Sequence, residues 1–426
     1  MRKILLPFCF LALASCSMSK KIDKIAKKDM LTLPVFENAH TGIFIFNPEN
    51  NSKVFDYQSN KYFVPASNTK LMTCYAAMKY LGDSIPGIAY QVLNDSTIYI
   101  KGTGDPTFFH PDFPSQRVAD FLETYKTIVL EKPDFHEYLG SGWAWNDYDE
   151  DYQAPRSQMP LYGNVVKISQ TGSGIDATPD YFQSYLKVPD SVSSSDKISV
   201  SRPWSENIFI VNKGRSENLD IPFVPMDSTM TSLLSAALHR NVILRNEKVN
   251  DFNIVYSRPL DSMLSIMMHR SDNFFAEQSL LMVSDKLAGF MNDRAVIQKL
   301  LSTDYAGMPQ KPSWVDGSGL SRYDLFSPRD IVFVLKKMKD DFGMERIEKI
   351  LPTGGTGTLS SLYHNERGKI FAKTGTLNGV VALSGYLITE KNNILIFSIL
   401  VNNHRGSAGE VRKAIEKFLI KVREMN

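Results

Sequence analysis

Hydrophobic and polar positions along the chain predict strands near both ends of the sequence. Apolar runs over residues 41–48 and 53–57 are typical of two neighbouring strands, and residues 380–388 and 394–401 show the same pattern near the C-terminus. A helical periodicity then covers residues 409–425. Strands from both ends with helices between them indicate one sheet that is closed by both termini and flanked by helices, an α/β-type core.

The middle of the chain has a different texture. From residue 106 to residue 239, short candidate strands, frequent Pro and Gly and a Ser-rich segment interrupt any long helical pattern. We interpret this stretch, 106–239, as an inserted and mostly β region within a core formed by residues 31–105 and 240–426. Longer helical periodicity returns over residues 228–238, 260–268 and 274–283.

One predicted helix is distinguished by the residues at its start. The apolar run 71–78 follows Pro65-Ala66-Ser67-Asn68-Thr69-Lys70, so Ser67 and Lys70 lie three residues apart on one helical face. The positive end of the helix dipole favours an alkoxide or a bound oxyanion at Ser67. A buried lysine can lose its charge and act as a base, which is the role that we expect for Lys70. Ser67 is therefore a candidate nucleophile.

Length, composition and charge narrow the class of protein. The chain has 426 residues, of which 43% are hydrophobic and 11% aromatic, as is typical of a folded protein with two or more domains. The formal net charge is +2, and two of the positive charges, Arg2 and Lys3, lie in a segment that we expect to be removed. A mature chain so close to neutral gives no indication of nucleic acid as a partner.

The first residues have the pattern of a secretory signal. Residues 1–15 combine two basic residues, an apolar stretch and small residues. The following Cys16 completes a sequence that resembles the lipobox of bacterial lipoproteins and predicts a lipid anchor; a general signal peptide with a chance cysteine is the alternative. We expect residues 16–30 to form a solvated tether, and the protein to be periplasmic and anchored to a bacterial membrane, the outer one favoured. Cys74 then has no disulfide partner and is expected to be an inert core residue.

Three short motifs follow one another in order. Ser-x-x-Lys at Ser67/Lys70 is weak by itself, because the same spacing recurs at three other places, but only Ser67 opens a long apolar helix. Ser271-Asp272-Asn273 lies between two helical stretches, and Lys373-Thr374-Gly375 occurs once and enters the terminal strands. Together they match the signature of penicillin-binding proteins and serine β-lactamases. The alternative is coincidence, with a capping serine and two turns.

Further motifs make the resemblance more specific. They are Gly102-Thr103-Gly104-Asp105-Pro106-Thr107, Gly142-Trp143-Ala144-Trp145-Asn146-Asp147, Asp316-Gly317-Ser318-Gly319-Leu320-Ser321-Arg322 and Lys373-Thr374-Gly375-Thr376-Leu377. With them, residues 41–403 resemble the S13 peptidase family, the low-molecular-mass class C penicillin-binding proteins that act as D-alanyl-D-alanine carboxypeptidases and endopeptidases. The resemblance implies an α/β (α+β) transpeptidase-like core, with an antiparallel sheet flanked by helices and a large insertion between the first two motifs.

The resemblance also implies a role for each motif residue. Ser67 would attack the carbonyl of the penultimate D-Ala of a peptidoglycan stem peptide, or that of a β-lactam, and form an acyl-enzyme that water hydrolyses. Lys70 would take the serine proton. Ser271 would relay a proton to the leaving amine in the positive field of Lys373, and Asn273 would hydrogen-bond the substrate backbone. No cofactor and no metal is implied.

A second set of residues would hold the substrate. The backbone N–H groups of Ser67 and Thr376 would form an oxyanion hole. The hydroxyls of Thr374 and Thr376, with the neighbouring lysine of the motif, would receive the terminal carboxylate. Gly375 and Leu377 belong to the same substrate-binding strand.

Two more positions concern the side chain of the stem peptide. Asp147 and Arg322 match family positions that bind the amine and carboxylate end of diaminopimelate, a zwitterion that needs one anion and one fork-shaped cation. The alternatives are a loop residue beside Trp145 for Asp147, and a surface ion pair for Arg322. We expect Trp143 and Trp145 to be packing residues.

Other classes of hydrolase fit less well. His136-Glu137 lacks the second histidine of His-Glu-x-x-His, and no Gly-x-Ser-x-Gly elbow occurs. A serine β-lactamase-like hydrolase is the closest rival, but the Glu-x-x-x-Asn spacing that class A enzymes use for deacylation is missing. A catalytically weak, penicillin-recognising wall-binding protein is the other alternative. It would be expected to have lost Lys70, Ser271 or Lys373, and all three are present.

Overall fold

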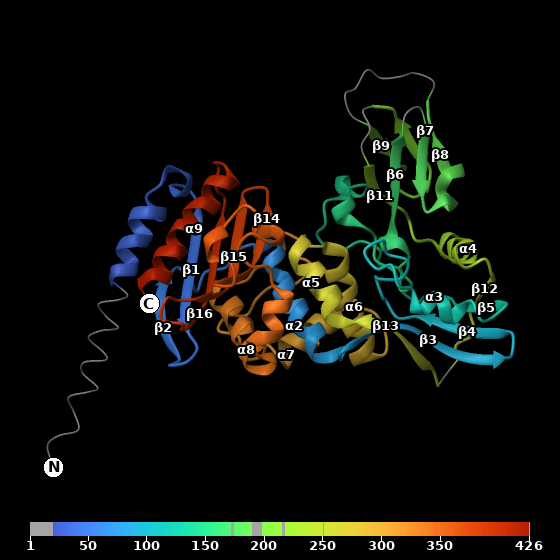
Figure 1. The fold of residues 1–426 in the computed structure, drawn as a ribbon, viewed down its shortest axis with the longest axis horizontal. Coiled ribbons are helices and arrows are strands. Elements are labelled where there is room, and N and C mark those ends of the chain that lie inside the picture. Colours follow the sequence, from blue (N-terminus) through green and yellow to red (C-terminus); the bar gives the residue numbers. More distant parts are fainter. Residues whose placement is uncertain (1–19, 172–173, 190–197, 215–217, 250, 426) are drawn as a thin grey trace, which may run out of the picture. The chain divides into compact units, whose positions relative to one another are not determined.

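The computed structural model of the protein describes residues 20–171, 174–189, 198–214, 218–249 and 251–425 (Figure 1). The predicted signal segment and Cys16 lie outside these residues. The chain forms two compact units. The first comprises the described parts of Met1–Tyr75, Leu264–Asp272 and Ile297–Asn426, and the second those of Ala76–Met263 and Asn273–Val296.

The first unit is built on the sheet that the sequence predicted. Its five antiparallel strands have the order β14-β15-β16-β1-β2, so the two ends of the chain meet where β1 pairs with β16. The strands are β1 (His40–Asn47), β2 (Ser52–Tyr57), β14 (Ile370–Leu377), β15 (Val380–Ile388) and β16 (Ile394–Asn402). Apolar residues on central strands drive this arrangement because they bury both faces of the sheet.

Helices cover the two faces of this sheet. On one face, the apolar side of α9 (Ala408–Met425) packs in a core cluster that includes Ile399 of β16 and Ala372 of β14. On the other face, the hydroxyl of Tyr386 in β15 donates to the carbonyl oxygen of Leu335 in α8 (Pro328–Ile350) at 2.7 Å. Because side chains alternate along a strand, Lys373 points to the face opposite to its neighbour Ala372.

The N-terminal segment is packed rather than solvated. Residues 20–26 are helical and continue into a π-type turn over Lys27–Leu31. Ile22, Ala26 and Met30, which are spaced four residues apart, are fully buried in the same core cluster as α9. The predicted tether over residues 16–30 is therefore wrong for the described residues 20–30. The segment is rich in lysine, so the helical spacing of its three apolar residues was not recognised in the sequence.

Asp29 fastens this N-terminal segment to α9. Its buried carboxylate forms ion pairs with Lys417 at 3.0 Å and with Lys421 at 2.8 Å. The hydrogen bonds from these two lysines lower the pKa of Asp29 below its ordinary value of 3.8. The ionised form is thus favoured by folding, and this stabilisation is complete above the ordinary pKa and is lost as the pH falls through the lowered one.

Replacing Asp29 with asparagine should lower the free energy of unfolding by about 1–2 kcal/mol at neutral pH, because two charge-assisted bonds are lost. The difference in melting temperature between the wild type and Asp29→Asn should shrink as the pH is lowered from about 7 to about 3. Asp23→Asn is the control, since Asp23 pairs with Lys27 at the exposed surface of the same segment. Equal effects of the two substitutions would contradict the docking role of Asp29.

In the residues that the structure describes, the second unit contains three sheets together with several helices. A five-stranded mixed sheet has the order β12-β5-β4-β3-β13, and two three-stranded sheets have the orders β11-β6-β7 and β8-β10-β9. The strands are β3 (Ser84–Asn94), β4 (Thr97–Gly102), β5 (Thr127–Glu131), β6 (Val165–Thr171), β7 (Gly174–Thr178), β8 (Leu186–Lys187), β9 (Ser199–Ser201), β10 (Phe209–Asn212), β11 (Asn218–Pro222), β12 (Asn241–Arg245) and β13 (Asn253–Pro259). The unit is larger than the predicted insert 106–239, because β4 pairs with β5 and β3 pairs with β4, so both belong to this sheet and not to that of the first unit.

The remaining helices agree with the predicted periodicity where one was seen. They are α2 (Lys70–Tyr80), α3 (Arg117–Leu122), α4 (Asp227–Leu238), α5 (Leu260–Arg270), α6 (Asn273–Ala288) and α7 (Asp293–Ser302). The sequence predicted α2, α4, α5, α6 and α9, but not α3, α7 or α8. Within the described part of the chain, no helix has the length and apolar character that a membrane span requires.

Candidate active site

Ser67 lies in a tight turn that leads directly into a helix. The turn is the 3-10 segment η3 (Ala66–Thr69), and α2 begins at Lys70, so Ser67 precedes the α-helix instead of lying within its first turn. Ala66 has a φ of +48°, which turns the chain sharply before the serine. The side-chain amide of Asn68 donates to the carbonyl oxygen of Lys373 at 2.9 Å. This bond holds the serine turn against β14.

Lys70 contacts the candidate nucleophile directly. Its Nζ donates to Ser67 Oγ at 2.9 Å and to the carbonyl oxygen of Ser318 at 2.9 Å. The lysine is fully buried, whereas Ser67 is half-buried. The 2.9 Å between Lys70 Nζ and Ser67 Oγ is a distance over which a base can take a proton from a nucleophile. Cys74, one turn further along α2, is buried and forms no disulfide, as expected.

A second lysine and serine form a matching pair beside them. Lys373 is fully buried, and its Nζ donates to Ser271 Oγ at 2.8 Å and to the carbonyl oxygen of Thr374 at 2.8 Å. Burial, and then the charge of Lys70, hold the pKa of Lys373 well below its ordinary value. Two buried amines that each hydrogen-bond a serine hydroxyl thus lie in the first unit, close enough to influence each other's charge.

Ser271 reaches this position through an unusual backbone conformation. It follows the last residue of α5, and its φ of +62° lies in the left-handed region, which costs a residue with a side chain about 1–2 kcal/mol. The N–H of Asp272 donates back to the carbonyl oxygen of Met267 at 3.0 Å and closes the end of the helix. The cap therefore fixes the backbone from which the Ser271 side chain projects, and the bond from Lys373 holds its hydroxyl.

Comparison with known proteins agrees with this geometry. A model of the D-Ala-D-Ala carboxypeptidase 3 (S13) family matches residues 18–422. The chain belongs to this family. The D-alanyl-D-alanine carboxypeptidase of Actinomadura sp. strain R39 is 25% identical, over 88% of this chain and 80% of its own. The D-alanyl-D-alanine carboxypeptidase DacB of Haemophilus influenzae is 21% identical, over 91% of this chain and 90% of its own.

Solved structures share the fold. The crystal structure of penicillin-binding protein 4 from Haemophilus influenzae has a TM-score of 0.72 at 20% identity, and covers 94% of this chain and 98% of its own. Bd3459, a predatory peptidoglycan endopeptidase from Bdellovibrio bacteriovorus, has a TM-score of 0.51 at 13% identity, over 91% of this chain and 93% of its own. The transpeptidase-like core predicted from the sequence is confirmed.

An S13 motif supplies the loop beneath the serine turn. The buried carboxylate of Asp316 accepts the N–H of Gly319 at 2.6 Å and that of Ser321 at 2.7 Å, which closes the loop into a compact turn. Gly319 has a φ of +79°, and a Cβ at this position would lie 1.9 Å from the carbonyl oxygen of Ala66. Only glycine therefore lets this loop approach the residue that precedes Ser67.

Gly319→Ala should displace the serine turn and lower the rate of penicillin acylation by at least about tenfold, with a melting temperature lower by several degrees. The matched control is Gly289→Ala. Gly289 has the same φ of +79°, but nothing lies within 4 Å of the added Cβ. Both variants carry the backbone cost of alanine at positive φ, about 1 kcal/mol, so the difference between them measures the clash with Ala66. Equal acylation rates in the two variants would contradict the claim that a clash with Ala66 displaces the serine turn.

The other predicted site residues are placed as follows. Asn273 begins α6, and its Nδ2 donates to the carbonyl oxygen of Tyr152 at 2.8 Å. Asp147 is half-buried and accepts a bond from Asn146 at 3.1 Å, within the second unit. Arg322 is exposed in the first unit and donates to the carbonyl oxygen of Asn378 at 3.0 Å. Asp147 and Arg322 thus belong to different units, and each is described within its own.

Trp143 and Trp145, both in the second unit, differ in exposure. Trp143 is half-buried, and its ring lies 5.7 Å from the guanidinium of Arg156. Trp145 is 74% exposed, so the predicted packing role is wrong for it. Trp145 lies in the short segment η4 (Trp145–Asp147), in which no residue is buried.

The strand that carries the third motif has one partner that sequence reasoning missed. Thr374 and Leu377 are half-buried and Thr376 is exposed, while a Cβ on Gly375 would lie 2.8 Å from the carbonyl oxygen of Pro65. Nη2 of Arg412, on α9, donates to Thr376 Oγ1 at 2.7 Å. No signal in the sequence distinguishes Arg412 from the other basic residues of α9.

Proposed function

We propose that the protein is a serine D-Ala-D-Ala carboxypeptidase and DD-endopeptidase that cleaves peptidoglycan stem peptides through an acyl-enzyme on Ser67. One observation carries this proposal: Lys70 and Lys373, both fully buried, each hydrogen-bond a serine hydroxyl, at Ser67 and Ser271. Repulsion between two buried amines favours a state in which one of them is neutral and available as a base. The motifs and the S13 family match support the same reaction.

Acylation begins with proton transfer over the 2.9 Å contact between Ser67 and Lys70. When the Lys70 amine is neutral, it accepts the hydroxyl proton while Oγ forms a bond to the substrate carbonyl carbon. The backbone N–H groups of Ser67 and Thr376 stabilise the oxyanion, with about 3 kcal/mol for each donor. The carbonyl then re-forms, the C–N bond breaks, and Ser271 hands a proton to the leaving amine.

Lys373 sets the proton affinity of Ser271. When Lys70 is neutral, its repulsion no longer lowers the pKa of Lys373, which can then carry the charge. A charged Lys373 amine 2.8 Å from Ser271 Oγ makes this hydroxyl a better proton donor, and Ser271 is re-protonated from the buried amines. Asn273 hydrogen-bonds the peptide backbone of the acyl group. Water then attacks the ester, the bond between Ser67 Oγ and the acyl carbon breaks, and the serine recovers its proton.

Arg412 is part of the proposed binding site for the terminal carboxylate of the substrate. Thr374, Thr376 and Lys373 receive the terminal carboxylate, and the guanidinium bound to Thr376 Oγ1 adds a permanent positive charge there. Arg412→Ala should therefore raise KM about tenfold for peptides with a free terminal carboxylate and leave kcat nearly unchanged. Arg412→Lys should restore part of the loss. Lys413→Ala, at the next and exposed position, is the control; an equal rise in KM in this variant would indicate a general charge effect.

Asp147 and Arg322 are proposed to recognise the side chain of the stem peptide. A guanidinium suits the carboxylate at the end of diaminopimelate and a carboxylate suits its amine, whereas lysine at that position offers only an amine. Hydrolysis rates of two peptides that differ only in this residue test the assignment. Arg322→Ala should reduce the rate for the diaminopimelate peptide and leave that for the lysine peptide; a uniform reduction would contradict this role.

The activity is tested by incubating the protein with muropeptides and identifying the products by mass spectrometry. Loss of one D-Ala indicates carboxypeptidase activity, and conversion of cross-linked dimers to monomers indicates endopeptidase activity. A penicillin that is rapidly hydrolysed and released, with muropeptides left intact, would favour a β-lactamase instead. Covalent labelling by penicillin without turnover of any muropeptide would favour the weakly catalytic wall-binding protein.

We also propose that the protein is exported and held in the periplasm by a lipid on Cys16, with the outer membrane favoured over the inner one. The lipobox-like sequence before Cys16 supports this. Metabolic labelling with a radioactive fatty acid should mark the wild type, and Cys16→Ser should lose both the label and sedimentation with membranes. A general signal peptide would instead yield a soluble, unlabelled protein from both genes.

A further inference from the structure

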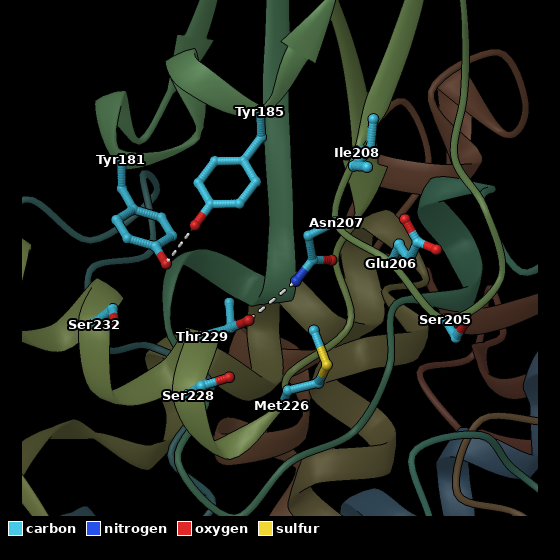
Figure 2. A pocket seen from close by; sticks show the side chains of 10 residues that line it. All are labelled: Tyr181, Tyr185, Ser205, Glu206, Asn207, Ile208, Met226, Ser228, Thr229 and Ser232. Carbon is cyan, nitrogen blue, oxygen red and sulfur yellow. Dashed lines mark hydrogen bonds between the residues drawn. The ribbon is translucent and has the colours of Figure 1, made fainter.

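The second unit holds a pocket apart from the residues used in the proposed reaction. It has a volume of ≈ 410 Å³ and lies between the segment η7 (Asp180–Tyr185), residues 205–208 and the first turns of α4 (Figure 2). The size falls within the range of about 300–1,000 Å³ that is usual for small-molecule sites. Side chains with hydroxyl or amide groups make up most of its lining, and two of them are tyrosines that present both a ring and a hydroxyl.

The tyrosines form one side of a hydroxyl network. The hydroxyl oxygens of Tyr181 and Tyr185 lie 3.1 Å apart, and their rings are 5.4 Å apart between centroids. Burial, together with the bond to Tyr185, raises the pKa of Tyr181 to about 12, so this phenol remains a hydrogen-bond donor at neutral pH. Figure 2 shows both hydroxyls pointing toward each other on the side of the pocket above Ser232.

The opposite side of the pocket is held in place before any ligand arrives. Asn207 is 5% exposed, and its Nδ2 donates to the carbonyl oxygen of Val224 at 2.9 Å and to Thr229 Oγ1 at 3.2 Å. Its Oδ1 accepts the N–H of Val224 at 2.7 Å. These bonds fasten residues 205–208 to the start of α4, so little conformational entropy is lost when a ligand binds.

The charge of the lining selects the class of ligand. Among the described residues that line the pocket, Glu206 is the one ionisable at neutral pH, and none is a lysine, an arginine or a histidine. Phosphates and the carboxylate-rich stem peptides would be repelled by Glu206. A purely apolar ligand would strip water from the serine, threonine and tyrosine hydroxyls without replacing its hydrogen bonds. A neutral, polyhydroxylated molecule replaces those bonds and can lie against a tyrosine ring.

We infer that this pocket binds a short stretch of neutral saccharide, the glycan part of the polymer whose peptide part the proposed reaction cleaves. The assignment to wall glycan rests on the proposed function, whereas the saccharide chemistry rests on the pocket. The tyrosine rings contact the apolar face of a sugar ring, the hydroxyl network bonds its hydroxyls, and the carboxylate of Glu206 accepts from a pair of them. Such a site would hold the enzyme on glycan strands while stem peptides are cleaved.

The test is isothermal titration of the full-length protein with a tetramer of β-1,4-linked N-acetylglucosamine, a neutral probe without a peptide. We expect saturable binding with one site per chain. The double variant Tyr185→Phe/Glu206→Gln, which removes one hydroxyl and one charge but keeps both side-chain shapes, should weaken binding by at least about tenfold. Tyr256→Phe/Glu123→Gln alters the same residue types at exposed positions of the same unit and should bind like the wild type. Melting temperatures of both variants establish that they fold.

The inference would be overturned by a lack of saturation with the tetramer, or by equal affinity in the two double variants. Displacement of the tetramer by a sugar-free stem peptide would also overturn it, because the pocket would then be a peptide site. The proposed function stands or falls separately, since covalent labelling of wild-type Ser67 by penicillin involves no glycan. Labelling without tetramer binding would refute only the saccharide pocket.

Discussion

Ser67→Ala is expected to abolish covalent labelling by fluorescent penicillin and to lower the rate of D-Ala release from muropeptides by at least about 10⁴-fold. The physical reason is that Ser67 Oγ supplies the bond to the acyl group, and alanine has no atom that can replace it. The fold should be kept. Ser67 is half-buried in η3, and the Asn68 bond to the Lys373 carbonyl that holds this turn does not involve its hydroxyl.

The chain provides a matched control for this substitution. Ser184 is also followed by a lysine three residues later, Lys187, but it is exposed and belongs to the second unit. Ser184→Ala should be labelled and should turn over muropeptides like the wild type. Persistent labelling of Ser67→Ala would mean that another residue is the nucleophile, and the mechanism proposed here would then be wrong.

Lys70→Arg is expected to reduce the acylation rate by about 10³-fold or more, although it keeps a positive charge beside Ser67. An arginine side chain keeps its proton at any pH that a protein survives, so it can hydrogen-bond Ser67 but cannot take its proton. Wild-type acylation should accelerate as the pH rises and one of the buried amines loses its proton. The residual activity of Lys70→Arg should lack this acceleration.

The larger guanidinium could also disturb a site that is fully buried. Lys70→Met is therefore measured beside it, because methionine is an unbranched side chain that is one atom shorter than lysine and removes both the charge and the base. If Lys70 is the base, both variants lose acylation to a similar extent while their melting temperatures show a folded protein. If Lys70 only supplies positive charge, Lys70→Arg stays active and only Lys70→Met fails, which would contradict the proposed role. Lys187→Arg, in the exposed Ser-x-x-Lys sequence, is the control.

The order of the motifs was readable from the sequence because each one lies where local structure begins or ends. Ser67 precedes an apolar helix, Ser271 separates two helices, and Lys373 enters the C-terminal strands, all of which the structure confirms. Apolar runs of the right length predicted the strands that pair β1 with β16. Such local patterns depend on few neighbours, so they survive without knowledge of the fold.

Interactions between distant segments could not be predicted in the same way. Arg412 meets Thr376 because α9 packs beside β14, and no feature of its charged surroundings distinguished it. Ile22, Ala26 and Met30 are buried only because α9 presents an apolar side to them, so a lysine-rich segment was mistaken for a tether. Residues 84–102, which form β3 and β4, were included in the core because the sequence does not show that β4 pairs with β5.

By itself, the sequence determined which residues we propose to carry the chemistry and in what order they occur: Ser67 and Lys70, then Ser271, then Lys373. Only the tertiary structure decided that they form two hydrogen-bonded amine–hydroxyl pairs. It places Lys373 on the sheet face away from α9, turns Ser271 toward it through a left-handed backbone, and lets the glycine loop at Gly319 approach the serine turn. These relations join residues up to about 300 positions apart, and close packing of side chains, which no local pattern encodes, sets them.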